Sequence, residues 1–215
     1  MKDKYTETFE TWDKVAKLYQ DLFMDLNLYD DTYDLFCKRV SKINANIFEI
    51  GCGPGNITKY LLSKRPDFIV EAIDISPNMI ELAKANNPSA NCLVMDSRNI
   101  DYITAKFDAV IIGFCIPYLS ESDVSKLVED CSNLLEVGGI LYLSFVEGDS
   151  SDSGFQTGSS GDRAYFYYHN LEVLKTVLQE NNFMIHDLIY KPYMKRDGSE
   201  EVHTILIAEL VSNTP

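Results

Sequence analysis

The stretch Ile47-Phe48-Glu49-Ile50-Gly51-Cys52-Gly53-Pro54-Gly55-Asn56 decides how this chain folds. An apolar run with the length of a buried strand leads into three glycines at alternate positions, and residues 57–61 continue with helical spacing. Glycines at such a corner permit backbone angles closed to other residues and let the main chain touch a ligand. The helix start beyond them offers unpaired N–H groups. The same pattern also fits a tight turn that binds nothing.

Strand and helix signals alternate on both sides of this corner. Apolar runs follow at about 69–73, 91–95, 107–112 and 139–146, and helical spacing occurs at 9–23, 33–40 and 171–178. One helix is expected to begin at the Ser76 cap and to stop before Pro88, and another to run from Glu121 to a left-handed Gly138. The sequence therefore predicts an α/β fold. We expect a Rossmann-like, doubly wound seven-stranded sheet, mostly parallel with an antiparallel last strand, and helices on both faces.

An acidic residue ends the next predicted strand. Asp74 lies twenty-three residues after Gly51, close to the separation of about 20 residues at which a doubly wound fold presents a carboxylate to ribose hydroxyls. An isolated aspartate before Ser76 would more often cap the following helix. Coupled to the glycine loop, Asp74 favours a ligand with an adenosine-like part.

A nicotinamide dinucleotide fits this loop poorly. Its fingerprint spaces the glycines as Gly-x-Gly-x-x-Gly, whereas here the third glycine comes one residue early and Asn56 occupies the expected place. Glu49 directly before the loop would repel a pyrophosphate and attract an ammonium group. These residues favour a cofactor with a cationic amino-acid end.

Five segments then occur in a characteristic order. They are Glu49-x-Gly51-Cys52-Gly53-Pro54-Gly55, Asp74-Ile75-Ser76-Pro77-x-Met79, Met95-Asp96-Ser97, Phe107-Asp108-Ala109-Val110 and Leu134-Leu135-x-x-Gly138-Gly139. In order and spacing, this set resembles the motifs of the class I S-adenosylmethionine-dependent methyltransferases over about residues 45–146. The resemblance implies S-adenosyl-L-methionine as cofactor, S-adenosyl-L-homocysteine as product, and an enzyme that methylates an acceptor.

The resemblance also implies roles for individual residues. Those implied to bind the cofactor are Gly51, Cys52, Gly53 and Gly55 at the methionyl and ribose parts, Glu49 near the ammonium, Asp74 at the ribose, Ile75 and Met79 flanking the adenine, Asp96 at the adenine amino group, Ser97 beside the ring, Phe114 over the methionine end and Tyr19 as an aromatic cap. Many relatives carry a histidine pair after the fourth strand, where this chain has Cys115-Ile116-Pro117-Tyr118-Leu119. No catalytic residue is therefore assigned.

Acceptor contacts are expected from segments outside these motifs, which are the N-terminal helices, the 114–120 loop, and the polar loop with its exit at 163–169. Residues 163–169 follow a polar stretch and contain four aromatic residues, one cation and one imidazole. Arg163 there would clamp a small anionic molecule, and Tyr118, Tyr168 and His169 are further candidates. The plainer alternative for this segment is a strand edge that leads into a helix.

Composition limits the partners. Nineteen basic against thirty-three acidic residues give a formal charge of −14, so we expect no nucleic-acid partner and no binding to anionic lipid. No apolar run approaches the ~18 residues that span a bilayer, and the start of the chain lacks a signal-peptide core. Five scattered cysteines without a Cys-x-x-Cys pair argue against disulfides and against a metal site, and favour a reducing cytoplasm.

The length of 215 residues fits one domain. We expect an N-terminal helical cap (1–44), a cofactor-binding core (45–146), a mobile polar loop (147–163) and a C-terminal helix with an antiparallel strand pair (164–215), joined through a turn at Arg196-Asp197-Gly198-Ser199. The leading hypothesis is a methyltransferase with a small-molecule acceptor, which works mainly by positioning. A non-catalytic S-adenosylmethionine-binding regulatory module and an NAD-type oxidoreductase are the alternatives. Monomer and dimer stay open.

Overall fold

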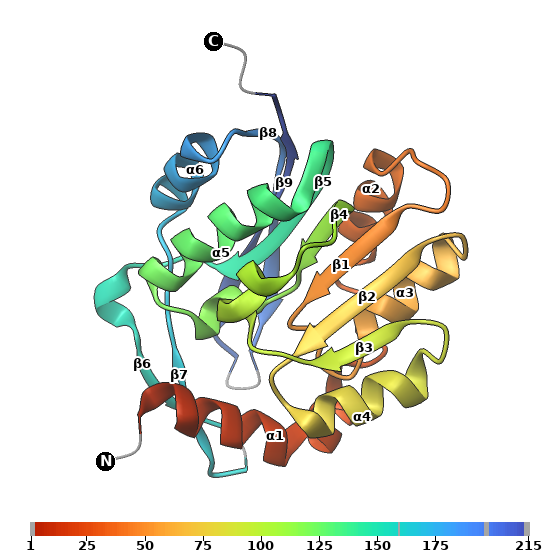
Figure 1. Cartoon of the computed structure of the whole chain (residues 1–215). Helices are drawn as coiled ribbons and strands as arrows, with labels where there is room; N and C mark the ends of the chain where they lie inside the picture. Colours follow the sequence, from red (N-terminus) through yellow and green to blue (C-terminus); the bar gives the residue numbers. More distant parts are fainter. Residues whose placement is uncertain (1–2, 159, 196–197, 213–215) are drawn as a thin grey trace.

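The main sheet has the predicted number of strands and the predicted class. The computed structural model describes residues 3–158, 160–195 and 198–212 (Figure 1). Its seven-stranded sheet has the order β3-β2-β1-β4-β5-β9-β8. The strands are β1 (Asn46–Ile50), β2 (Ile69–Asp74), β3 (Asn91–Val94), β4 (Phe107–Ile112), β5 (Leu135–Val146), β8 (Phe183–Met194) and β9 (Glu200–Leu210). β1 to β5 pair in parallel, and β9 runs antiparallel between β5 and β8. The antiparallel last strand is therefore interior, and β8 forms the edge.

Helices cover both faces of this sheet. α2 (Asp30–Arg39), α3 (Asn56–Lys64) and α4 (Pro77–Asn86) enclose one apolar cluster, to which β1 contributes Ile47. α5 (Glu121–Leu134), α6 (Leu171–Glu180) and the 3-10 segment η1 (Ser97–Tyr102) enclose the other, to which β1 contributes Phe48. Because alternate side chains of a strand point to opposite faces, a strand covered on both sides is apolar throughout. This explains the continuous runs in the sequence.

The first helix lies apart from these two layers. α1 (Lys4–Phe23) crosses the sheet edge at which the parallel strands end (Figure 1). It is fastened to the start of α4 by Asp13, whose carboxylate accepts hydrogen bonds from Ser76 Oγ (2.7 Å) and from the backbone N–H of Asn78 (3.0 Å). Ser76 in turn accepts from the N–H of Met79, as its predicted role as a helix cap requires. α1 is thus fixed as a cover over the strand ends.

The segment 147–163, expected to be a mobile polar loop, contains secondary structure, and its mobility stays a prediction. This segment contains a short 3-10 turn, η3 (Ser150–Asp152), and an antiparallel hairpin of β6 (Gly154–Thr157) and β7 (Arg163–Phe166). Polar groups of α1 hold the second strand of this hairpin. Thr8 Oγ1 accepts from the backbone N–H of Tyr165 (2.9 Å), and Thr11 Oγ1 donates to the carbonyl of Arg163 (2.8 Å).

One predicted boundary is also wrong. The helix expected to reach Gly138 ends at Leu134, because Leu135 already pairs with Phe107 of β4. Gly138 does adopt a left-handed backbone (φ +84°), but it does so where the β4–β5 register shifts rather than at a helix cap. In the predicted turn between β8 and β9, Arg196 and Asp197 lie outside the described residues.

Candidate functional site

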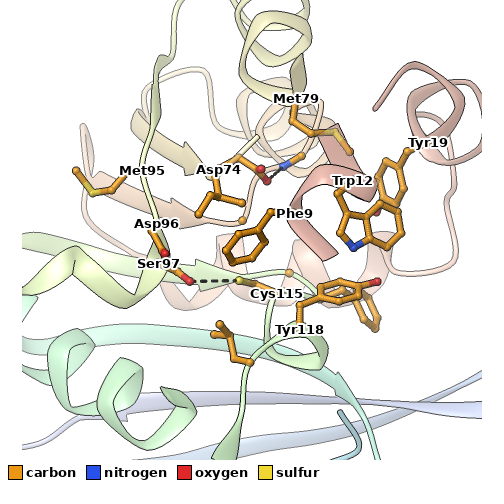
Figure 2. Close-up of a pocket in the computed structure, with 16 residues that line it drawn as sticks. Phe9, Trp12, Tyr19, Asp74, Met79, Met95, Asp96, Ser97, Cys115 and Tyr118 are labelled. Atoms are coloured by element: carbon orange, nitrogen blue, oxygen red, sulfur yellow. Dashed lines mark hydrogen bonds between the residues drawn. The ribbon is translucent and has the colours of Figure 1, made fainter. Parts of the chain in front are cut away.

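A cavity lies between α1 and the ends of β1, β2 and β4 (Figure 2). The glycine loop reaches it because the N–H groups of Gly51 and Cys52 both donate to the carbonyl of Ile73 on β2 (2.8 and 2.9 Å). The wall consists of Phe9, Trp12, Tyr19, Gly51, Gly53, Asp74, Ile75, Met79, Met95, Asp96, Ser97, Gly113, Phe114, Cys115, Tyr118 and Leu119.

Most of the predicted cofactor residues meet in this wall. Those that line it are Tyr19, Gly51, Gly53, Asp74, Ile75, Met79, Asp96, Ser97 and Phe114, and the predicted acceptor residue Tyr118 joins them. Glu49, Cys52 and Gly55 lie outside it. The sequence does not single out the remaining members, Phe9, Trp12, Met95, Gly113, Cys115 and Leu119, individually, although Phe9 and Trp12 belong to the N-terminal helices and Cys115 and Leu119 to the 114–120 loop, from which acceptor contacts are expected. The helical spacing of Phe9, Trp12 and Tyr19 was the only signal for the first two.

Asp74 is a polar group of the cavity that two backbone N–H groups hold in place. Its Oδ2 accepts a hydrogen bond from the N–H of Gly53 (2.9 Å), and its Oδ1 accepts one from the N–H of Ser76 (2.9 Å). Removal from water raises the pKa of Asp74, and these two N–H groups oppose that shift. The carboxylate is thereby oriented at the end of β2, with lone pairs left for donors of a ligand.

The glycine loop brings bare backbone to the cavity. A side chain at Gly53 would approach a ring carbon of Tyr19 (3.8 Å) and the sulfur of Met79 (4.0 Å). A Cβ at Gly51 would lie 2.7 Å from Cβ of Cys115, and Gly51 has φ +72°. Only glycine combines this backbone angle with so close an approach of the β4 loop.

Gly55 has a different function in the structure. Its Cβ position lies 2.3 Å from Nδ2 of Asn87 and 3.3 Å from Ala83, so its missing side chain lets α3 pack against α4. Asn87 Nδ2 also donates to the carbonyl of Gly55 (2.9 Å). Gly55 is therefore a packing residue in this structure.

The packing role of Gly55 can be tested by measuring the free energy of unfolding of Gly55→Ala. We expect it to lower the free energy of unfolding by about 1–2 kcal/mol for the left-handed backbone (φ +82°) and by a further 1–3 kcal/mol, approximately, for the overpacked contact. Gly161→Ala is the matched control, because Gly161 has φ +81° and nothing within 4 Å of its Cβ position. Urea unfolding of both variants measures the difference. Equal losses would contradict the packing role.

Glu49 and Cys52 are buried beside the loop. Glu49 lies between β1 and α3, where Thr58 Oγ1 donates to its Oε2 (2.5 Å), while Oε1 has no hydrogen-bond partner among the described residues. Burial raises the pKa of Glu49 to about 8. Cys52 belongs to the apolar cluster under α2, α3 and α4. A contact of Glu49 with a ligand ammonium stays a prediction.

Asp96 and Ser97 form the wall beyond β3. The carboxylate of Asp96 is paired with Arg98, whose backbone N–H donates to Oδ1 (2.9 Å) and whose Nη2 donates to Oδ2 (2.5 Å). The Arg98 guanidinium lies over the ring of Tyr5, 4.3 Å from its centroid. Ser97 Oγ accepts from the thiol of Cys115 (3.9 Å; Figure 2). A ligand donor would therefore share Asp96 with Arg98.

Phe114 has an unusual backbone. With φ +54° it is a non-glycine residue in the left-handed region, stabilised by a hydrogen bond from its N–H to Ser144 Oγ (3.0 Å). Its ring packs against Tyr29 and His203, with centroid separations of 5.1 and 4.9 Å. Strained positions of this kind cluster at ligand clamps and active sites.

The four predicted acceptor residues do not meet. Only Tyr118 lines the cavity. Arg163 pairs with Glu7 and lies over the ring of Phe155, and Tyr168 donates to Glu201 Oε1 (3.4 Å). His169 is buried with Nε2 3.1 Å from the carbonyl of Ile116, and its burial lowers its pKa. The segment 163–169 thus contains the strand edge that leads toward a helix, not an assembled anion clamp.

Two structural findings bear on metals and membranes. Among the described residues, no group of three or more His, Cys, Asp or Glu side chains is placed to hold a metal ion. Over the same ranges, none of the helices has the length and apolarity that a bilayer crossing demands.

Known proteins share parts of this sequence. Residues 47–139 match a family described as a methyltransferase domain. Over 100 residues the chain is 36% identical to a putative methyltransferase of Invertebrate iridescent virus 6. This match covers 46% of this chain and 37% of that protein. Over 171 residues it is 25% identical to a tRNA N(3)-methylcytidine methyltransferase of Schizosaccharomyces pombe. This match covers 74% of this chain and 68% of that protein. The chain thus spans from about a third to about two thirds of the length of these relatives.

The fold is also known from solved structures. The chain is similar to a 1,6-didemethyltoxoflavin-N1-methyltransferase of Burkholderia thailandensis, with a TM-score of 0.73 at 15% identity over 99% of this chain and 92% of that one. At that identity the likeness concerns the fold. The matched methyltransferase domain, the sheet order and the ordered motifs together support a class I S-adenosylmethionine-dependent methyltransferase.

Proposed function

We propose that the cavity binds S-adenosylmethionine and that the chain transfers its methyl group to a small-molecule acceptor. The observation that carries this proposal is Asp74, a carboxylate oriented by two backbone N–H groups at the end of β2, next to the glycine loop. A carboxylate in that place accepts hydrogen bonds from both hydroxyls of a ribose. S-Adenosylhomocysteine would be the product.

The other lining residues complete this arrangement. Gly51 and Gly53 offer backbone to the methionyl part under the ring of Tyr19, and Ile75 and Met79 provide apolar surface for the adenine. Asp96 and Ser97 face the edge of that base, and Phe114 closes the methionyl end. Glu49 would have to release its proton when the cofactor binds in order to neutralise the ammonium from behind the loop. Because α1 covers the whole set, the cofactor would be enclosed between α1 and the sheet edge.

The chain would contribute mainly geometry to the reaction. When bound, the sulfonium would supply an already activated methyl group: the acceptor nucleophile attacks the methyl carbon in line while the carbon–sulfur bond breaks and S-adenosylhomocysteine leaves. Residues that hold the acceptor about 3–3.5 Å from the methyl carbon then supply most of the rate enhancement. Tyr118 and Phe114 would form the boundary between the two molecules. A general base is required only for an acceptor that arrives protonated, and no lining residue is assigned that role.

A small acceptor suits the enclosure of the site. α1, the glycine loop and the loops after β3 and β4 line the cavity, so a macromolecule would have to present a thin, flexible group to enter it. The acidic charge of −14 also disfavours RNA, although one relative carries the name of a tRNA methyltransferase. We place the protein in a reducing cytoplasm, because all five cysteines are free thiols in the structure.

Titration calorimetry tests the cofactor assignment. We expect S-adenosylmethionine and S-adenosylhomocysteine to bind with one site per chain and NAD to give no heat of binding. A higher affinity for NAD would overturn the proposal in favour of an oxidoreductase. Transfer of labelled methyl groups to a library of small molecules then separates an enzyme from a regulatory module, because only an enzyme forms S-adenosylhomocysteine continuously.

A further inference from the structure

Aromatic side chains of α1 form the roof of the cavity. Phe9, Trp12 and Tyr19 all line it. The indole of Trp12 meets Tyr19 edge-on, with centroids 5.6 Å apart at 88°, and meets Tyr118 at 5.2 Å and 67°. Asp13, the next residue along, fastens this turn of α1 to α4. Trp12 is therefore held in a fixed position between the α1 roof and the loop after β4.

The indole nitrogen of Trp12 has no hydrogen-bond partner among the described residues, and it is buried. Figure 2 shows this nitrogen on the side of the indole that faces into the cavity. Buried donors are almost always paired, because an unpaired one loses its hydrogen bond to water without replacement. A donor fixed in this way at a cavity wall is suited to an acceptor atom of a bound molecule.

The charges of the wall restrict that molecule. None of the described residues that line the cavity is a lysine or an arginine, and its carboxylates belong to Asp74 and Asp96. Burial raises the pKa of Tyr19 and of the Cys115 thiol to about 12 and raises that of Tyr118 as well, so these groups are uncharged at neutral pH. No described side chain of this wall would therefore give an anionic acceptor a cationic partner. Arg163, the cation expected to clamp one, is paired with Glu7 elsewhere.

We propose that the methyl acceptor is an uncharged, planar molecule with a carbonyl oxygen or ring nitrogen that accepts a hydrogen bond from Trp12 Nε1 and packs against the ring of Tyr118. This inference rests on the proposed function and deepens it. Planar rings suit a wall of tilted and edge-on aromatic side chains. Pairing the buried N–H also gives selectivity, because analogues without the accepting atom leave it unpaired.

The single tryptophan makes a direct test available. Trp12 is the only tryptophan of the chain, so an ¹H–¹⁵N spectrum contains one indole N–H resonance. Protein saturated with S-adenosylhomocysteine is titrated with three planar probes of matched size: quinolin-2-one, naphthalene-2-carboxylate and naphthalen-2-ylmethylammonium. We expect quinolin-2-one to move the indole proton downfield in a saturable way, and the two charged probes to bind at least about ten-fold more weakly.

Trp12→Phe is the companion variant, since it keeps an aromatic ring and removes the donor. We expect its affinity for quinolin-2-one to fall about five-fold, which corresponds to one hydrogen bond of about 1 kcal/mol, and to fall by more than its affinity for S-adenosylhomocysteine. Binding of S-adenosylhomocysteine to the variant also shows that it is folded.

The outcomes separate this inference from the proposed function. If S-adenosylhomocysteine alone moves the indole proton downfield and the variant loses affinity chiefly for it, Trp12 serves the cofactor and the inference is overturned. Preferred binding of either charged probe, or no response of the resonance to quinolin-2-one, overturns it as well, while the cofactor assignment stands. If S-adenosylhomocysteine does not bind the native protein, the proposed function itself fails, and the inference fails with it.

Discussion

Asp74→Asn is expected to weaken S-adenosylmethionine binding by at least about 100-fold. Hydrogen bonds to a charged group contribute about 1.5–3 kcal/mol each, and the proposed pose gives Asp74 two ribose hydroxyls, so the loss is roughly 3–6 kcal/mol. The amide also turns one oxygen into a donor. Whichever way it is oriented, an NH₂ group then opposes the N–H of Gly53 or of Ser76, both of which now donate to the carboxylate. Calorimetry at pH 7.5 measures the affinity.

Asp108→Asn is the matched control for this substitution. Asp108 also flanks a strand and accepts a backbone N–H, that of Asn46 (2.9 Å), but it lies at the start of β4, the opposite end of the sheet from the cavity. We expect the affinity of Asp108→Asn for S-adenosylmethionine to stay within about two-fold of that of the native protein, because the substitution changes only interactions of Asp108 with its own neighbours. If Asp74→Asn bound S-adenosylmethionine with the native affinity, Asp74 would not contact the ribose, and the proposed pose would be wrong.

The closeness of the glycine loop and Asp74 could be predicted from the sequence, for a physical reason. Parallel strands end at one edge, so a glycine loop after one strand and an acidic residue after its neighbour must lie close together. β1 and β2 pair in register from Asn46 opposite Ile69 to Ile50 opposite Ile73, which brings Gly51 and Asp74 to the same edge. The local sequence pattern and the parallel topology were together sufficient to predict this part of the cavity wall.

The roof of the cavity could not be found in the same way. Phe9 and Trp12 occupy a helical stripe, but a stripe shows only that one face of α1 is covered, and not whether core or ligand covers it. The hairpin was missed for a related reason. Its Ser, Gly and Asp residues predict no core, and its hydrogen bonds come from Thr8 and Thr11, about 150 residues earlier in the chain.

Gly55 and Glu49 show the limit of a motif. All three glycines of the loop have positive φ, yet one is required for helix packing and two form the cavity wall. Glu49 stands directly before the loop in the sequence, but the alternation of β1 turns its side chain toward Thr58 of α3. The contacts of a glycine or an acidic residue in the motif depend on the helices and strands that pack beside it. The motif alone does not specify those neighbours.

Glu49→Gln is expected to make the protein more stable than the native chain at alkaline pH. The folded protein holds the Glu49 proton up to a pKa of about 8, whereas the unfolded chain releases it near the ordinary value of 4.5. This contribution to stability is therefore fully present below pH 4.5 and is lost as the pH rises toward 8. Glutamine cannot ionise, so the variant avoids that loss. Between pH 5.5 and 8.5 its advantage should grow by on the order of 3 kcal/mol.

Comparing two variants at each pH isolates this effect. Burial lowers the pKa of His169 and His203, so both cost stability as the pH falls below about 6.5, but they do so equally in the native chain and in Glu49→Gln. Urea unfolding at pH 5.5, 7.0 and 8.5 gives the required free energies, and Glu129→Gln on the exposed side of α5 supplies a control that removes a carboxylate without burial. A constant difference between Glu49→Gln and the native protein across this range would mean that Glu49 is already ionised in the fold. Its unpaired Oε1 would then be a fixed negative charge behind the glycine loop, available to an ammonium group without any release of a proton.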